Sequence, residues 1–318
     1  MAVTIKDVAQ EAEVSIATVS RYINQSGYVS PDSADKIKKA IKKLGYLAKN
    51  SPQSSMQKHL IEVNFPNIEN PFYAELFENL SRYLANKGYD CVLHLDHFHI
   101  QNFDYYLRRF RKKEISGLIT SSLLHISKGE LNQNLPIISF DRQIDKQIPT
   151  VQSNNLDAGA QIAQSVLERG KKEILIIAGA REDYYPINDR IKGMMRVFNT
   201  YKAHITLDSL NASDSIIAKK MAIQGMVTDK KIDAICCTDD ITALLAKQTA
   251  DYLGIKSLIT GFDGTRLIQS LFPSLITARQ PIQELAELMS DLLISRIVDP
   301  ERKLNSIYTL PVQLINQL

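Results

Sequence analysis

No apolar run in the sequence reaches the length of about 18 residues that a membrane-spanning helix needs. The first residues, MAVTIKDVAQEAEV, carry charges early and lack the apolar stretch of a secretory signal peptide. These two absences predict a cytoplasmic protein with no membrane partner.

Cysteine is scarce, with three residues in the chain, and no two have the spacing of a zinc site or a disulfide framework. The six histidines are not spaced with cysteines or carboxylates as metal ligands would be, and no glycine-rich phosphate loop is present. The adjacent pair Asp239-Asp240 is a weak catalytic candidate, because neighbouring side chains point apart on most backbones. The sequence therefore predicts no metal, no cofactor and no enzymatic activity.

What is present is a globular composition with an uneven charge. The chain has 318 residues, 44% of them hydrophobic and 23% charged, which suits two or three domains. Residues 1–60 hold nine basic and five acidic side chains, a net charge of +4, against +3 for the whole chain. A basic end on a near-neutral body is typical of a protein that binds a polyanion there, although a charged solvated surface would give the same excess.

Residues 1–46 have the pattern of three short helices. Thr4 can cap the first, with Asp7 as its partner in a capping box, and Ser15 can cap the second. Ser30-Pro31 opens the third, with proline at the first helical position. An apolar stripe along each helix predicts a small common core.

Residues 47–58, LAKNSPQSSMQK, are polar and read as a linker, after which strands and helices alternate. This alternation predicts parallel sheets covered by helices on both faces, an α/β body large enough for two sheets. Apolar segments predict strands at 60–65, 91–95, 117–120, 136–140, 174–178, 234–237 and 258–262, and amphipathic segments predict helices at 73–87, 157–169, 189–201, 213–228 and 240–253.

The first two helices, joined by a tight turn, form a predicted helix-turn-helix, whose second helix can enter the DNA major groove. Arg21 can donate two hydrogen bonds to a guanine, and Ile16 and Ala17 can contact thymine methyl groups. A three-helix bundle without a ligand would show the same bare pattern. Hydroxyl and amide groups suited to phosphate oxygens lie at Thr4, Ser15, Thr18 and Asn24, and Ser20 is a further exposed position.

Longer motifs narrow this interpretation. The segments TIKDVA at 4–9, VSIATVSRYIN at 14–24, GYVS at 27–30 and LGY at 44–46 resemble the head of the lactose/galactose repressor family, and the similarity extends over essentially the whole chain. The resemblance implies a helix-turn-helix head at 1–46, a hinge helix within 47–58, and a two-lobed body at 59–318 like the periplasmic sugar-binding proteins. It adds Tyr28 and Ser30 to the candidate DNA contacts.

In this family the body forms a homodimer on a pseudo-palindromic operator, and the hinge helix inserts an apolar side chain into the minor groove. Tetrameric members carry an additional C-terminal heptad segment, so a chain ending at Leu318 is expected to be a dimer. Lobe 1 is expected at about 59–155 and 281–307, and lobe 2 at about 156–280 and 308–318.

The sequence departs from the family pattern at two places. Glu13 stands where the turn usually has glycine, and a positive φ there would cost about 1 kcal/mol. Direct alignment puts Ser55 at the minor-groove leucine of the hinge. A shifted helix, with Ser51 as cap and Pro52 at its first position, puts Met56 there instead, and Met56 is the preferred candidate.

Polar residues at the ends of strands are the natural ligand positions of doubly wound sheets. Carboxylate, amide and guanidinium groups can bind vicinal hydroxyls, and an aromatic ring such as Phe72 can cover the apolar face of a sugar. Asp240 is expected to cap a helix rather than bind a ligand. The candidates, raised by the resemblance to positions lining the effector cleft, are Asn70, Phe72, Tyr73, Asp141, Arg142, Arg190, Asp239, Asp263 and Gln280.

The run Phe140-Asp141-Arg142 is similar to the sucrose- and ribose-operon branch of the family, with ribose as the first expected effector and sucrose the second. The arginines leave room for a phosphorylated sugar. The expected function is a sugar-regulated repressor of a sugar-utilisation operon, in which the sugar weakens binding to double-stranded operator DNA. The alternatives are a sugar-binding or transport protein, and a sugar-metabolising enzyme on the same fold.

Overall fold

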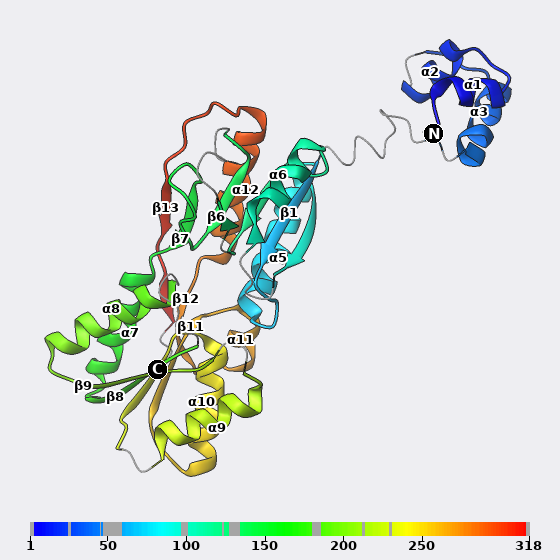
Figure 1. The fold of residues 1–318 in the computed structure, drawn as a ribbon. Coiled ribbons are helices and arrows are strands. Elements are labelled where there is room, and N and C mark those ends of the chain that lie inside the picture. The colour runs from blue at the N-terminus through cyan, green and yellow to red at the C-terminus, as the bar shows by residue number, and fades with distance from the viewer. Residues whose placement is uncertain are drawn as a thin grey trace. The chain divides into compact units, whose positions relative to one another are not determined.

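The computed structural model describes residues 3–24, 27–44, 46, 59–96, 101–122, 124–126, 134–179, 186–211, 214–228 and 231–315. The chain divides into two compact units, one containing the N-terminal helices and one containing nearly all of the body. Figure 1 shows the N-terminal helices and the body, in which helices cover two separate sheets.

The head consists of α1 (Ile5–Glu11), α2 (Ile16–Asn24) and α3 (Pro31–Leu44). The predicted capping box is present, since the Asp7 carboxylate accepts from the backbone N (2.7 Å) and Oγ1 (2.8 Å) of Thr4. Ser15 Oγ likewise accepts from the backbone N of Thr18 at 3.1 Å and so holds the first turn of α2. The apolar stripes meet in a small core in which Val8, Val19 and Ile37 have no exposed surface.

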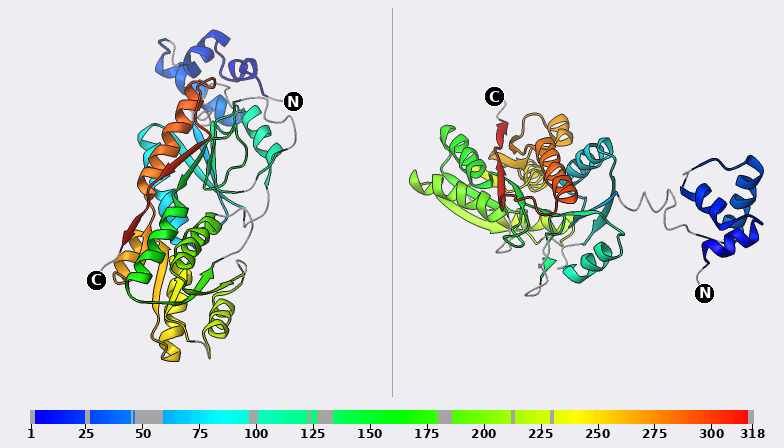
Figure 2. Two further views of the ribbon diagram at one scale, coloured as in Figure 1. Left: turned by 90° about the vertical axis from the view of Figure 1, so that its left-hand side faces the viewer. Right: turned by 90° about the horizontal axis from the view of Figure 1, so that it is seen from above.

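The first lobe is built on a six-stranded sheet in the order β13-β7-β6-β4-β1-β2. Figures 1 and 2 show α5 (Pro71–Asn86) and α12 (Ile282–Val298) side by side against it, and the apolar residues of both helices share one core with its strands. On the other face of the sheet, the hydroxyl of Tyr106 in α6 (Phe103–Arg111) accepts from Nδ2 of Asn64. Asn64 lies between the core residues Val63 and Phe65 in β1, so its side chain points to the opposite face from theirs. The strands are β1 (Leu60–Phe65), β2 (Asp90–Leu95), β4 (Gly117–Thr120), β6 (Ile137–Phe140), β7 (Thr150–Ser153) and β13 (Ile307–Leu310), and β3 (Gln101–Asn102) pairs with β5 (Leu124–His125) apart from them.

The second lobe has its own six-stranded sheet, in the order β14-β12-β11-β10-β8-β9. Helices α7 (Asn155–Glu168) and α8 (Pro186–Thr200) cover one face, and α9 (Ile216–Val227), α10 (Asp240–Leu253) and α11 (Arg266–Leu271) cover the other. The β12–β14 pair is antiparallel, so this sheet is mixed rather than wholly parallel. Its strands are β8 (Glu173–Ala178), β9 (His204–Ser209), β10 (Ala234–Cys237), β11 (Leu258–Asp263), β12 (Ile276–Arg279) and β14 (Gln313–Ile315).

The chain passes between the two sheets three times. The first two passages follow β7 and β12, beside Ser153 and Gln280. The third was expected near 307, but β13 pairs with β7 through Leu310, so this passage lies between Leu310 and Gln313. Within the described ranges, no helix is long and apolar enough to span a membrane.

Candidate DNA-binding and effector sites

The second helix of the head presents a polar and a small apolar surface on the side away from the core. Ile16 and Ala17, on its first turn, and Arg21, one turn later, are exposed, while Val19 is fully buried beneath them. Tyr28 is 85% exposed, and Ser30 caps α3 by accepting from the backbone N of Ser33 at 3.3 Å. The candidate base-reading residues therefore share one accessible face, as a recognition helix requires.

Four of the candidate contacts, Thr4, Ser15, Thr18 and Ser30, have hydroxyls that are already hydrogen-bonded within the head. Ser15 Oγ lies 2.8 Å from Thr18 Oγ1, and Thr4 Oγ1 donates to Asp7. A phosphate oxygen only accepts hydrogen bonds, so Thr4 would have to release Asp7 before it could donate to DNA. Only one proton is used between Ser15 and Thr18, so one of these two hydroxyls keeps its proton for another acceptor. The side chain of Asn24 and all of residues 47–58, including Met56, lie outside the described residues, and both predictions stay predictions.

The turn of the helix-turn-helix confirms the expected strain at Glu13. Its φ is 53°, in the left-handed region that favours glycine. The same region is adopted by Asp141 (φ 61°) and Asp263 (φ 108°), two of the candidate effector residues. Strained backbone that the surrounding structure holds in place is often found at ligand sites.

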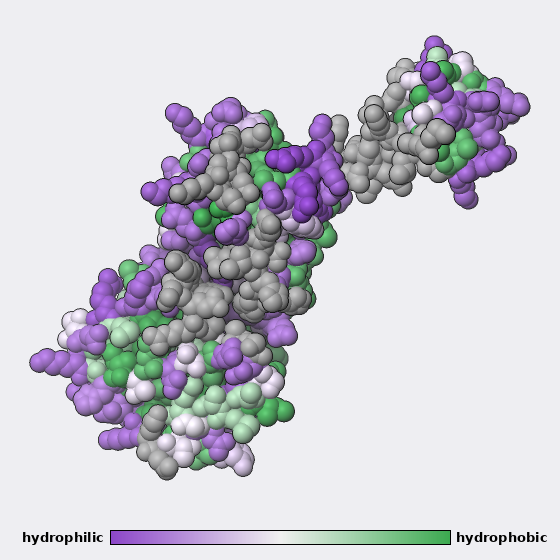
Figure 3. All heavy atoms as spheres, in the orientation of Figure 1, coloured by the Kyte–Doolittle hydropathy of each residue, from purple (hydrophilic) through white to green (hydrophobic). Residues whose placement is uncertain are grey.

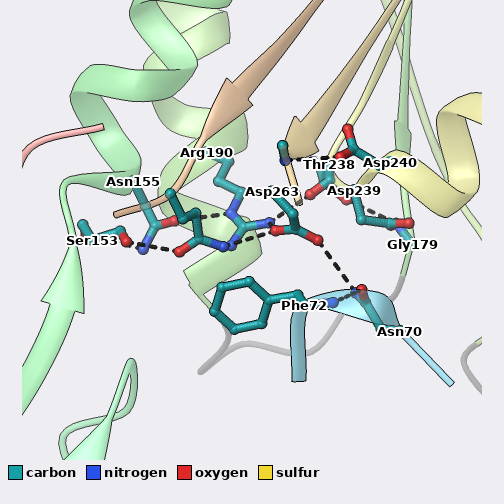
Figure 4. Close-up of polar contacts among 12 residues, drawn as sticks. Asn70, Phe72, Ser153, Asn155, Gly179, Arg190, Thr238, Asp239, Asp240 and Asp263 are labelled. Atoms are coloured by element: carbon teal, nitrogen blue, oxygen red, sulfur yellow. Dashed lines mark hydrogen bonds and ion pairs between the residues drawn. The ribbon is translucent and has the colours of Figure 1, made fainter. Parts of the chain in front are cut away.

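In the body, the candidate residues Asn70, Phe72 and Asp263 lie near Arg190, as Figure 4 shows. Arg190 is only 6% exposed and lies over the ring of Phe262, with 3.6 Å between the guanidinium carbon and the ring centroid. Its Nε donates to Asn155 Oδ1 at 2.9 Å, and its Nη1 donates to the backbone O of Thr238 at 2.6 Å. These contacts hold the guanidinium in one orientation at the carboxyl end of the second sheet.

Asp263, the last residue of β11, joins groups from both lobes. It accepts from Arg190 Nη1 at 3.3 Å, from Gln280 Nε2 at 2.8 Å and from Asn70 Nδ2 at 3.3 Å (Figure 4). This carboxylate is therefore bonded to three side chains of the protein, and a sugar bound there would share it with them. Burial raises the pKa of Asp263 to about 6, although the neighbouring Arg190 lowers it.

Asp141 lies at the equivalent end of β6 in the first lobe. Its Oδ1 accepts from the backbone N of Ser153 and from Nδ2 of Asn155, each at 3.4 Å. Burial raises the pKa of Asp141 to about 6, and the nearby Arg190 opposes this shift. Burial therefore raises the pKa of both candidate carboxylates in the same direction.

The helix-capping role expected of Asp240 belongs to Asp239 in the structure. Asp239 is the N-cap of α10, since its Oδ1 accepts from the backbone N of Thr242 at 2.8 Å. Asp240 is 2% exposed and accepts from Thr277 Oγ1 at 2.6 Å and from the backbone N of Gly264 at 2.8 Å. Asp240 thus joins three elements at the end of the second sheet, and burial raises its pKa well above the ordinary value.

The aromatic candidates lie at the first turn of α5. Asn70 caps this helix by accepting from the backbone N of Phe72 at 2.9 Å. The Phe72 ring is 4% exposed and stacks on Phe140 with centroids 5.6 Å apart, and in Figure 4 it lies beside the polar cluster. Tyr73 is half-buried, and burial raises its pKa. Arg142 is 8% exposed and close enough to Asp141 and Tyr73 to influence both pKa values.

Two polar residues at the first passage between the lobes were missed by sequence reasoning. Ser153 Oγ donates to Gln280 Oε1 at 2.7 Å, which joins the first and second passages. Asn155 holds both Asp141 and Arg190. The polar run Ser153-Asn154-Asn155 occupies the same kind of position as the other candidates, but the strand before it was not predicted.

The arrangement can bind hydroxyl groups. Carboxylate acceptors, amide groups and an immobilised guanidinium lie together at the carboxyl ends of two sheets, beside an aromatic ring. The described residues here supply hydrogen-bonding groups and no nucleophile paired with a general base, which fits binding rather than catalysis.

A helix-turn-helix head on a two-lobed sugar-binding body defines a DNA-binding regulator that responds to a small ligand. Comparison with known families agrees: residues 4–49 match the bacterial regulatory proteins of the lacI family, and residues 58–311 match the periplasmic binding proteins and sugar binding domain of the LacI family. The chain belongs to the LacI family of transcriptional repressors, which are not enzymes.

Known relatives extend over the full chain. The sequence is 34% identical to a sucrose operon repressor of Lactococcus lactis, over 98% of both chains. It is also 34% identical to a ribose operon repressor of Halalkalibacterium halodurans, over 98% of this chain and 95% of that one. The fold matches the lac repressor dimer bound to operator and an anti-inducer with a TM-score of 0.71 at 19% identity, covering 99% of this chain and 98% of the other.

Proposed function

We propose that this repressor controls a sugar-utilisation operon, and that a sugar bound between the lobes weakens its binding to operator DNA. The observation that carries this proposal is the set of bonds on Asp263. Its partners come from the second lobe (Arg190), from a passage between the lobes (Gln280) and from the first lobe (Asn70). A ligand that binds these groups would alter the relation between the lobes.

The proposed effector is a sugar, with ribose first, sucrose second and a phosphorylated sugar third. Two of the three nitrogens of Arg190 already donate to Asn155, Thr238 and Asp263, which leaves one nitrogen of this arginine for a phosphate. The names of the relatives, sucrose and ribose operon repressors, support the same class.

A homodimer is the proposed assembly, with the outer surface of α9 to α11 as a contact surface. Ile217 and Met221, one turn apart on α9, are 73% and 68% exposed, and Leu271 of α11 is 63% exposed. A helix with apolar residues on its outer side is unusual unless a partner covers it. Figure 3 shows hydrophobic residues at the surface of the second lobe, in the lower half of the view.

For the DNA complex, the proposed units are the head at 1–46, the hinge at 47–58 with Met56 as its minor-groove residue, and the body at 59–318. The proposed DNA contacts are those predicted from the sequence, with Arg21 as the base-reading side chain. A DNA-binding role also places the protein in the cytoplasm.

The experiment is an operator selection from random DNA followed by gel shifts of the selected site at several salt concentrations. A repressor is expected to select a pseudo-palindrome and to bind it with an affinity that falls linearly, on logarithmic axes, with salt. Binding no tighter than to random DNA would contradict the proposal. Sedimentation of the free protein at micromolar concentration is expected to show a dimer, and a tetramer or monomer would contradict that part.

A further inference from the structure

A second set of bonds joins the two lobes outside the candidate effector site. The first residue of α11, Arg266, donates from its backbone N to Oε2 of Glu75 at 2.8 Å and from its Nε to Oε1 at 3.2 Å. Its Nη2 donates to Glu78 Oε2 at 2.7 Å. Glu75 and Glu78 lie on α5 of the first lobe, so one arginine of the second lobe binds two carboxylates of the first.

These bonds lie next to the site on both elements. Glu75 follows Asn70 by five residues along the start of α5, and Arg266 follows Asp263 by three. The same two segments therefore form the Asn70–Asp263 bond and the Arg266 bonds. Because each pair joins a residue of one lobe to a residue of the other, the bonds exist only when the lobes are close at this edge.

The hydrogen bonds of Arg266 hold its side chain in place more firmly than an ordinary surface ion pair would. The Glu75 carboxylate is 13% exposed and accepts from both a backbone and a side-chain N–H of one residue. Arg266 is 52% exposed and remains at the rim, where water and other ligands can reach it. A paired, hydrogen-bonded carboxylate of this kind fixes orientation as well as attracting charge.

We propose that Arg266, with Glu75 and Glu78, forms an interlobe latch that sets the equilibrium between closed and open arrangements of the lobes. The latch residues are positioning residues that do not touch the sugar. The proposal rests on the proposed function, and it takes the sugar to bind the closed arrangement. Removing the latch then favours the open arrangement and weakens sugar binding by the same population factor.

The direction of each effect follows from this equilibrium. Arg266→Ala is expected to raise the sugar dissociation constant about 3- to 10-fold, the range for one charged, hydrogen-bonded contact at a partly exposed site. Operator affinity without sugar should stay the same or increase, and operator affinity at saturating sugar should match the wild type. A variant that merely destabilised the protein would weaken binding to both ligands.

The test measures the lobes directly before any sugar is added. Spin labels at Ala85→Cys on α5 and Asn199→Cys on α8, both exposed positions, report the distance between the lobes. The expected result for full-length Arg266→Ala without sugar is a shift to longer or broader distances, with Arg266→Lys in between. The matched control is Lys192→Ala, which breaks an ion pair with Asp189 inside α8 and should change nothing.

The same variants are then titrated with ribose and with sucrose. An unchanged distance distribution in Arg266→Ala would overturn the latch whatever the sugar result. If the distance distribution of Arg266→Ala shifts but the wild type binds neither sugar, the latch is supported, and ribose and sucrose are not the effectors. A shifted distribution with an unchanged dissociation constant would show that the latch does not act on sugar binding, and would overturn the proposal.

Discussion

Asn70 and Asp263 meet across the two lobes, with the amide Nδ2 of Asn70 donating to Oδ2 of Asp263 at 3.3 Å. Asn70 caps the first helix of one lobe, and Asp263 ends a central strand of the other. Asn70 satisfies the helix terminus and the interlobe bond with different atoms of one amide, because Oδ1 accepts from Phe72 and Nδ2 donates to Asp263. Movement of either lobe would therefore be transmitted to the site.

Asp263→Asn is expected to abolish the response to sugar while leaving operator affinity nearly intact. The amide keeps the size of the side chain but gives up half its acceptors and the charge opposite Arg190. Asp263→Ala is expected to unfold more easily as well, by about 3–5 kcal/mol, because it removes the carboxylate that forms an ion pair with the buried Arg190. Operator release on adding sugar measures the first effect, and normal release by Asp263→Asn would show that the residue is not an effector contact.

Stability and sugar binding should depend on pH in opposite directions between about pH 4 and 6. The folded-state pKa of Asp141 is about 6, above the ordinary 3.8, so the folded protein holds this proton more tightly than the unfolded chain. Its contribution to the free energy of unfolding is therefore present at low pH and lost as pH rises to 6. Sugar hydroxyls donate to the ionised form, so sugar affinity should rise over the same interval.

The comparison that isolates this effect is wild type against Asp141→Asn, which resembles the protonated form. The stability of the variant relative to wild type should increase from pH 4 to pH 7, as measured by thermal unfolding at each pH. A relative stability that is flat or that falls would mean that the Asp141 pKa is not raised.

A separate prediction concerns Arg21 as the residue that reads a base of the operator. Arg21→Ala should weaken specific operator binding by about 1–3 kcal/mol and relax the preference at one guanine in each half-site. Lys49→Ala removes a positive charge from the predicted hinge at 47–58 and is expected instead to weaken binding to all sequences alike. Competition against operators substituted at each position distinguishes the two, and an unchanged specificity profile for Arg21→Ala would refute the assignment.

Glu13→Gly should stabilise the head by about 1 kcal/mol, because the residue has a φ of 53° that costs an L-amino acid this much. Slower hydrogen exchange of the α1 and α2 amides would measure the gain. Lys202→Gly is the matched control, since Lys202 has a φ of 56° after α8 and its replacement should stabilise the second lobe without changing the head.

Much of the fold was predictable because its signals are local. The apolar segments at 60–65, 117–120 and 234–237 are strands with those bounds, and Thr4, Ser15 and Ser30 begin helices as expected. The prediction that Asp240 caps a helix was wrong. Asp239 and Asp240 are both acidic residues after a strand, and which one caps α10 depends on where the helix begins, a difference of one residue.

The partners of the site residues were not predictable from the sequence. Strand ends indicated Asp141, Asp239 and Asp263, but the bonds of Asp263 to Asn70 and Arg190 join residues 193 and 73 positions apart. Such contacts depend on how two lobes are arranged around three chain passages. The strand β7 escaped detection because TVQS has only one strongly apolar residue, and Ser153 and Asn155 were missed with it.

The central claim is that one sugar site and one DNA site are coupled, and the most direct test is titration of sugar with and without saturating operator. The account predicts that operator raises the sugar dissociation constant 5- to 150-fold, a coupling of about 1–3 kcal/mol, and that sugar weakens operator binding by the same factor. Equal sugar affinity in the presence and absence of operator would contradict the account, and tighter sugar binding on operator would show that the sugar acts as a corepressor.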